Sequence, residues 1–211
     1  METIFKKNTA TFIVDAQKGF SELCPNELPV VGALNIVDEC LKTIKKTEYK
    51  IGSKDAHNKN SIWISNEKQP QFTQLNYPNA DCAWNLHCVP GTLGFEYLDG
   101  LPKEEDFDYF VWKGITSTLH PYSAIYHDLQ KKMTTGVLEF IKCKNIDTIL
   151  ITGLATNYCV LNTALDLKKA GLNVIVNLGG CAGIGDINPA LISMKSIGIR
   201  IVNSSEDIIS L

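Results

Sequence analysis

Cys159 stands at a point of the sequence where a reactive thiol could be placed. The apolar, partly β-branched run at 149–152 predicts a buried strand, which Gly153 ends. Thr156 and Asn157 are good N-cap residues, so Cys159 is predicted in the first turn of the following helix. A helix N-terminus lowers the pKa of a thiol and offers N–H groups to a developing oxyanion. Cys159 is therefore a candidate nucleophile, although a small buried thiol without chemical function fits the same pattern.

A nucleophilic thiol needs a neighbouring base. One source is histidine, of which the chain has 4: His57, His87, His120 and His127. Another is Asp15, which ends a predicted strand and could take the thiol proton if a cation holds the pair in its charged form. Lys113 directly follows the apolar run DYFVW and could supply that cation. Taken singly, Asp15 also fits a loop cap, and Lys113 also fits a surface lysine.

A second group of residues has the composition of a metal site. Asp55 and His57 are spaced i, i+2, which puts both side chains on one face of an extended segment. His87, in a later irregular stretch, could complete the group. A carboxylate with imidazoles suits Zn²⁺, Fe²⁺ or Mn²⁺, and three protein ligands leave a position for water or a substrate.

Alternating strands and helices are predicted to position these residues. Apolar runs predict strands at 10–15, 49–53, 108–112, 149–152, 173–177 and 199–202. Helical patterns occupy 31–46, 122–130, 135–143, 156–171 and 189–196, while 58–106 is irregular and GGCAG at 179–183 predicts a turn. This alternation favours an α/β fold with a parallel sheet covered on both faces. Sites in such folds lie at the carboxyl ends of strands. At or just after such ends fall Asp15, Asp55, His57, Lys113 and Cys159.

Composition narrows the function classes. A length of 211 residues suits one domain spanning 1–211. A net charge of −3 argues against a nucleic-acid or membrane partner, and a single arginine, Arg200, favours a neutral small substrate over a nucleotide. The 7 cysteines include no C-x-x-C, and no signal peptide or membrane span is evident, so a cytoplasmic protein with reduced thiols is expected. Homo-oligomer formation stays open.

Five sequence blocks, in order, resemble the nicotinamidases (pyrazinamidases) of the isochorismatase-like cysteine hydrolases. They are VDAQKGF (14–20), SKDAH (53–57), WNLHCVPGTLG (84–94), KGITSTLHPYSAI (113–125) and GLATNYCV (153–160). The resemblance implies a three-layer α/β/α sandwich with a mostly parallel six-stranded sheet. It also implies hydrolysis of nicotinamide, and of pyrazinamide, through a cysteine thioester, as in NAD salvage.

The same resemblance assigns roles to individual residues. It implies a catalytic triad of Asp15, Lys113 and Cys159. It implies one divalent metal ion, zinc in preference to iron or manganese, bound by Asp55, His57 and His87. The substrate contacts would be Phe20, Trp84, Tyr122 and Leu154. A cis peptide bond would join Leu154 to Ala155, and the main-chain N–H groups of Ala155 and Cys159 would form the oxyanion hole.

Two positions depart from the family pattern. Asn157 stands where the family often has Asp. Some members have a further metal ligand, commonly a His several residues after the position of His57, and the segment NKNSIWISN offers none. Water, or Glu67 just beyond that segment, could take its place.

Other functions remain open at the level of sequence. A relative of the same superfamily could hydrolyse a carbamoyl, ureido or other small amide without a metal. Ether hydrolysis of the isochorismate type fits less well, because that branch lacks the nucleophilic cysteine. A non-catalytic binding protein with the same fold, or a thiol peroxidase without an obvious resolving cysteine, would be the remaining alternatives.

Overall fold

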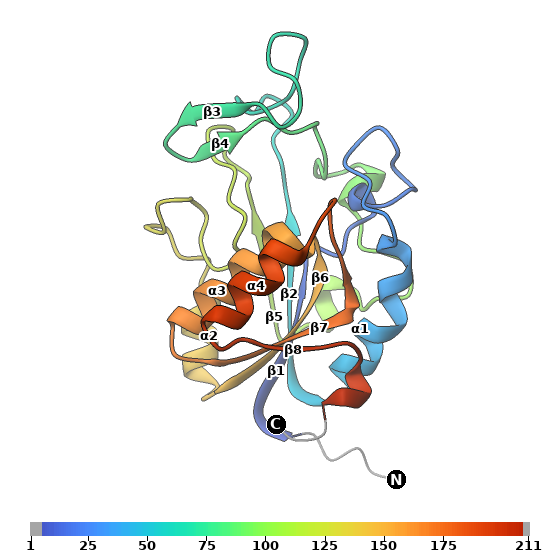
Figure 1. Ribbon diagram of the computed structural model, residues 1–211, viewed down its shortest axis with the longest axis vertical. Coiled ribbons are helices and arrows are strands. Elements are labelled where there is room, and N and C mark those ends of the chain that lie inside the picture. Colours follow the sequence, from blue (N-terminus) through green and yellow to red (C-terminus); the bar gives the residue numbers. More distant parts are fainter. Residues whose placement is uncertain (1–5, 209–211) are drawn as a thin grey trace.

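The centre of the molecule is a six-stranded sheet in the order β5-β2-β1-β6-β7-β8, and every neighbouring pair in it is parallel (Figure 1). The computed structural model describes residues 6–208. The strands of this sheet are β1 (Lys6–Val14), β2 (Thr47–Asp55), β5 (Tyr109–Lys113), β6 (Thr148–Leu154), β7 (Asn173–Ala182) and β8 (Arg200–Val202). The α-helices are α1 (Val37–Ile44), α2 (Val137–Cys143), α3 (Leu161–Lys169) and α4 (Asn188–Ser196). The predicted parallel α/β sheet is therefore confirmed.

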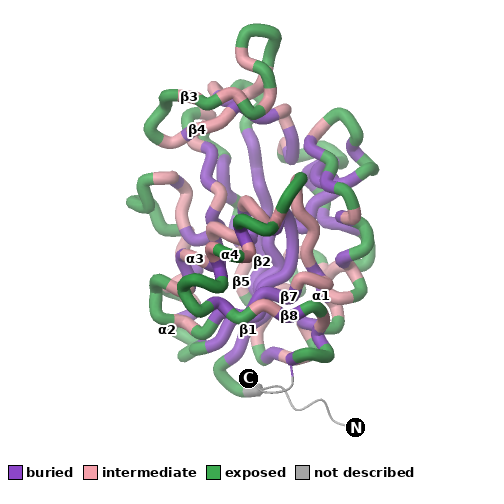
Figure 2. The backbone as a smooth tube through the Cα atoms, viewed as in Figure 1, coloured by how far each residue is buried: buried purple, intermediate pink, exposed green. Residues whose placement is uncertain are grey.

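Helices cover the two faces of the sheet unequally. On β1, Phe12 and Val14 belong to the core that also contains apolar residues of α2, α3 and α4, whereas Ile13 belongs to the core shared with α1. Figure 1 shows α1 on one side of the sheet and the other three helices on the opposite side. Alternate strand residues point to opposite faces, so the apolar runs of the central strands are buried throughout (Figure 2).

The strand order reverses between β1 and β6. From β1 the chain continues to β2 and later β5 on one side, and from β6 it continues to β7 and β8 on the other. The crevice outside the carboxyl ends of such neighbouring strands is where doubly wound sheets bind ligands. Asp15 directly follows β1, and the chain leaving β6 reaches Cys159 within five residues of Leu154.

Three predicted elements differ in the structure. Residues 122–130 form no helix, because the main-chain N–H of Ala124 is bonded to Thr163 Oγ1 and the carbonyls of Ala124 and Ile125 accept bonds from Thr135. The predicted turn at 179–183 is instead largely strand, as β7 runs to Ala182. Its glycines permit this, since a Cβ on Gly180 would lie 2.6 Å from the Thr152 side chain.

The predicted helix at 31–46 is divided, with a 3₁₀ turn at Ala33–Ile36 before α1. The irregular stretch 58–106 contains a small hairpin of β3 (Gln74–Tyr77) and β4 (Ala80–Cys82). Figure 1 shows this hairpin beyond the carboxyl ends of the central strands. Within 6–208, no helix combines the length and apolarity needed to cross a membrane.

Candidate active site

Lys113, the last residue of β5, lies at the centre of a buried polar cluster. Its Nζ is 2.5 Å from Asp55 Oδ1, 3.1 Å from Asp15 Oδ2 and 3.5 Å from Cys159 Sγ. Lys113 and Asp15 are both 0% exposed. One ammonium group thus contacts the two carboxylates and the thiol that the sequence singled out, and none of them is a surface group or a solvent-facing cap.

Sheet pairing places this cluster. Asp55 and Lys113 are register partners at the ends of β2 and β5. Asp15 follows β1 in a left-handed conformation with φ of 44°, which Asp tolerates better than most residues. Its main-chain N–H donates to the Ser53 carbonyl at 3.1 Å, and its Oδ1 accepts a bond of 2.7 Å from Ser53 Oγ. The carboxylate orientation is therefore set by the neighbouring strand.

Burial and mutual charge determine how these groups bind protons. Burial raises the pKa of Asp15, and the Lys113 ammonium offsets only part of that effect. Burial also raises the pKa of Asp55, but Lys113 and then His57 outweigh it, so the Asp55 pKa is lowered. For Cys159, burial raises the pKa of the thiol well above its usual value despite Lys113. The thiol is thus protonated at rest and needs a base, and Asp15 is the carboxylate with the higher proton affinity.

The turn that carries Cys159 is not the expected one. Thr156–Val160 forms a single π-helical turn before α3, its N-cap position is Ala155, and no side chain caps it. The predicted N-caps Thr156 and Asn157 are therefore wrong. The lowered thiol pKa expected from a helix N-terminus is wrong as well, because burial dominates.

Asn157 has a different function in the structure. Its Nδ2 donates to the Ile184 carbonyl at 2.8 Å, and its Oδ1 accepts from the Ile184 N–H at 3.0 Å. An amide can satisfy both groups, whereas a carboxylate cannot donate. Asn157 thereby ties the cysteine turn to Ile184, which lines the pocket described next.

A small pocket opens onto Cys159. It is mainly apolar and aromatic, a composition that suits an aromatic ligand. Its lining consists of Phe20, Leu28, Asp55, Trp84, His87, His120, Tyr122, Ala155, Tyr158, Cys159 and Ile184. Trp84 Nε1 donates to Tyr122 Oη at 3.3 Å, and Tyr122 Oη bonds to Asp81 Oδ1 at 2.8 Å, which fixes one wall.

The predicted substrate and oxyanion residues largely gather at this pocket. Phe20, Trp84 and Tyr122 line it, as do Ala155 and Cys159. The peptide bond between Leu154 and Ala155 is cis, as the resemblance implies. The Leu154 side chain is fully buried in the core shared with α1.

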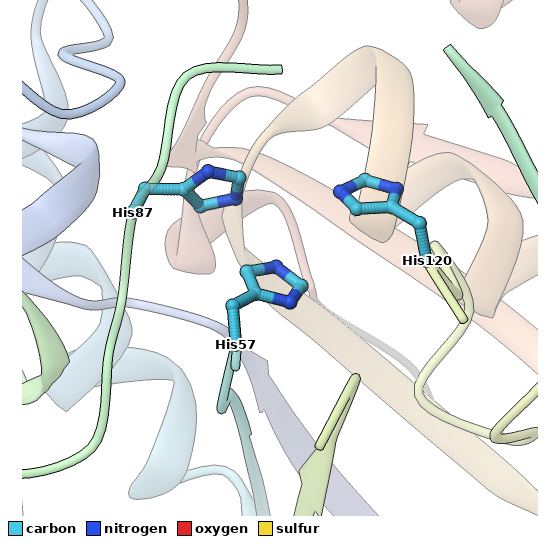
Figure 3. A group of neighbouring side chains, drawn as sticks. All are labelled: His57, His87 and His120. Atoms are coloured by element: carbon cyan, nitrogen blue, oxygen red, sulfur yellow. The ribbon is translucent and has the colours of Figure 1, made fainter. Parts of the chain in front are cut away.

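Three imidazoles meet beside the pocket: His57, His87 and His120 (Figure 3). His57 follows β2, His87 lies in the irregular stretch before β5, and His120 follows β5. One ring nitrogen of each lies within 4.8 Å of the others. Both ring nitrogens of His57 and of His120 are buried without a hydrogen-bond partner. His87 Nδ1 is 2.6 Å from the Asn85 carbonyl, so its Nε2 is the nitrogen available to a ligand. Burial lowers the pKa of His87 to about 3, so this imidazole is neutral, as metal ligation requires.

The predicted metal residues are thus only partly grouped. Asp55 Oδ1 lies 3.4 Å from His57 Nε2, but Asp55 is clustered with Asp15 and Cys159 around Lys113. Glu67, the alternative further ligand, is exposed and does not reach the histidines. The histidine that does is His120, which sequence reasoning counted only as a candidate base. Its position inside the block KGITSTLHPYSAI was the available signal.

Comparisons with known proteins agree with this geometry. The isochorismatase domain family matches residues 9–197. A nicotinamidase of Acinetobacter baylyi is 34% identical over 213 residues, covering 93% of each chain. The solved nicotinamidase pyrazinamidase of Acinetobacter baumanii superposes with a TM-score of 0.85 at 26% identity, covering 97% of this chain and 99% of that one. A pyrazinamidase of Pyrococcus horikoshii, solved in complex with zinc, has a TM-score of 0.73 at 27% identity, with coverages of 92% and 98%. The chain therefore belongs to the isochorismatase domain family, and its relatives there include nicotinamidases.

Proposed function

We propose that this protein hydrolyses nicotinamide to nicotinate and ammonia, and accepts the similar ring amide pyrazinamide. The observation that carries the proposal is the contact of Lys113 with Asp15, Asp55 and Cys159 beside a pocket lined by aromatic side chains. The nicotinamidase relatives support it, since two of them cover at least nine-tenths of this chain at 34% and 26% identity.

The residues of the cluster supply a covalent mechanism. Asp15 takes the proton of Cys159, and the thiolate attacks the carboxamide carbon. The N–H groups of Ala155 and Cys159 stabilise the resulting oxyanion. The carbon–nitrogen bond breaks as Asp15 returns the proton to the departing ammonia, which leaves a thioester. Water, deprotonated by Asp15, then attacks the thioester, nicotinate leaves and the thiol is restored.

Lys113 keeps the free energy of this proton transfer low. Moving a proton from Cys159 to Asp15 exchanges one anion for another, and both lie within 3.5 Å of the same ammonium. The buried Asp55, also bonded to Lys113, balances the positive charge when Asp15 is protonated. Phe20, Trp84 and Tyr122 would hold the aromatic ring of the substrate at the lining of the pocket.

A divalent metal ion, zinc in preference to iron or manganese, fits beside the pocket. Buried polar atoms are almost always paired in folded proteins, so the unpartnered nitrogens of His57 indicate a missing partner such as an ion. Asp55, His57 and His87 are the proposed ligands, and the zinc complex of the Pyrococcus relative supports a metal here. When bound, such an ion would be a Lewis acid able to hold the ring nitrogen of a pyridine.

The seven cysteines are all unpaired in the structure, which supports a reducing, cytoplasmic location. The whole chain is proposed to act as one domain.

The test is release of ammonia from nicotinamide, pyrazinamide and a panel of ureido and carbamoyl compounds. Cys159→Ala should abolish release while nicotinamide still binds, as measured by calorimetry. Cys143→Ala is the matched control, because Cys143 is an exposed thiol at the end of α2. Substantial turnover by the Cys159 variant would contradict the assignment of Cys159 as the nucleophile. Turnover of ureido compounds but not of nicotinamide would contradict nicotinamide as the substrate.

A further inference from the structure

His120 is a buried imidazole that the proposed chemistry does not use. It is 4% exposed, and both of its ring nitrogens lack a hydrogen-bond partner. A neutral histidine in a protein core normally donates through one nitrogen, since an unpaired buried polar atom destabilises the folded state. His57 has the same defect, and its ring lies 5.1 Å from that of His120, nearly parallel to it. Two adjacent rings without a hydrogen bond to any ring nitrogen require a shared explanation.

We propose that His120 is a further ligand of the metal ion, so that the three imidazoles of His57, His87 and His120 hold it beside the Asp55 carboxylate. The proposal builds on the metal-containing function proposed above. Figure 3 shows the three rings facing one space, from three different stretches of the chain. Their nearest nitrogens lie within 4.8 Å of one another, close enough for one ion to contact all three.

The surroundings of His120 hold its ring in place. Its main-chain N–H donates to the Asn79 carbonyl of the β3–β4 turn at 2.7 Å. The preceding carbonyl, of Leu119, accepts a 3.0 Å bond from Trp63 Nε1. The ring stacks on Trp84 at 5.9 Å and 10°, and meets Trp63 edge-on at 4.5 Å. Such outer contacts orient metal ligands in proteins.

The position of Trp63 explains why the third imidazole comes from the segment after β5. The segment NKNSIWISN after His57 contains no His, Cys, Asp or Glu, and the Trp63 ring lies next to the His57 ring at 4.6 Å. Asp55, for its part, is bonded to Lys113. Lys113 is the last residue of β5, and the segment that follows it carries His120 beside the pocket wall formed by Tyr122.

The first measurement counts ligands in the intact protein. X-ray absorption at the zinc edge of the zinc-loaded wild type should fit three imidazoles, and a fit to only two would overturn the inference. The second measures zinc affinity by competition with a coloured chelator. His120→Ala and His120→Gln should each lose at least about 10- to 100-fold, the loss that even outer-shell changes cause.

His127→Ala is the matched control, because His127 lies on the same chain segment but not in the cluster. Wild-type affinity in a folded His120 variant would count against the proposal. The outcomes separate this inference from the proposed function. If His120→Ala binds zinc as tightly as wild type, and wild type hydrolyses nicotinamide, only the assignment of His120 as a ligand is refuted. If His120→Ala loses zinc affinity, but wild type releases no ammonia from nicotinamide, only the proposed nicotinamidase activity is refuted.

Discussion

The ammonium nitrogen of Lys113 lies 3.5 Å from the sulfur of Cys159, although 46 positions separate the two residues. The same ammonium is bonded to two buried carboxylates, so it serves both reactivity and stability.

Lys113→Met should therefore lower both ammonia release and stability. Without the ammonium, Asp15 and Asp55 face each other without a countercharge, and breaking a buried ion pair costs about 3–5 kcal/mol. We expect kcat to fall by about 100-fold or more, as for loss of other transition-state electrostatics. Urea unfolding and ammonia release measure the two effects, with exposed Lys142→Met as control. Unchanged stability would contradict the charge cluster.

Asn157→Asp tests the link between the cysteine turn and the pocket wall. The variant keeps the acceptor for the Ile184 N–H but places a carboxylate against the Ile184 carbonyl in place of a donor. We expect a loss of about 1–3 kcal/mol in unfolding free energy and a higher KM. Asn35→Asp, at an exposed position, should change neither. A variant as stable as wild type, with unchanged KM, would show that the amide is not needed.

Gly153→Ala should disrupt the sheet at its centre. Gly153 has φ of +120°, and a Cβ there would lie 1.9 Å from the main-chain oxygen of Val14 on β1. We expect a loss of at least about 3 kcal/mol, or failure to fold. Gly171→Ala is the matched control, because φ is +90° there but nothing lies within 4 Å, so it should cost only about 1–2 kcal/mol. Equal losses measured by thermal unfolding would contradict the steric explanation.

Glu39→Gln should give a pH-dependent loss of stability. Burial raises the pKa of Glu39, but bonds from Lys42, Ser205 and Asn177 outweigh this and lower it to about 2. A lowered folded-state pKa stabilises above the unfolded value of 4.5, and the gain disappears as pH falls toward 2. The variant should be about 1–2 kcal/mol less stable at neutral pH. Urea unfolding measures the difference in stability between the variant and wild type. A difference that does not shrink as the pH falls from 4.5 to about 2 would contradict the assignment.

Much of the fold could be predicted from sequence because the buried strands are short apolar runs. The predicted runs end at Asp15 and Trp112, each one residue from the end of β1 at Val14 and of β5 at Lys113. The failed helix at 122–130 shows the limit. Its apolar pattern is real, since Ala124 and Ile125 are buried, but their main-chain bonds go to Thr163 and Thr135, which no local pattern reveals.

The candidate site could be predicted to the extent that its residues end strands. Asp15, Asp55 and Lys113 meet because parallel strands end at the same edge. The position of His120 could not be derived in this way. It depends on two residues of the irregular stretch: the Asn79 carbonyl accepts from the His120 N–H, and Trp63 Nε1 donates to the Leu119 carbonyl.

The pairing of Asp55 with Lys113 as partners in adjacent strands makes strand alignment a determinant of activity. Side-chain direction alternates at every residue, so a slip of one position would turn one charge of the pair to the opposite face. A polypeptide assembled in that slipped arrangement would keep its secondary structure and yet be inert. Recovery of turnover after refolding would then report correct alignment at this edge, which circular dichroism cannot detect.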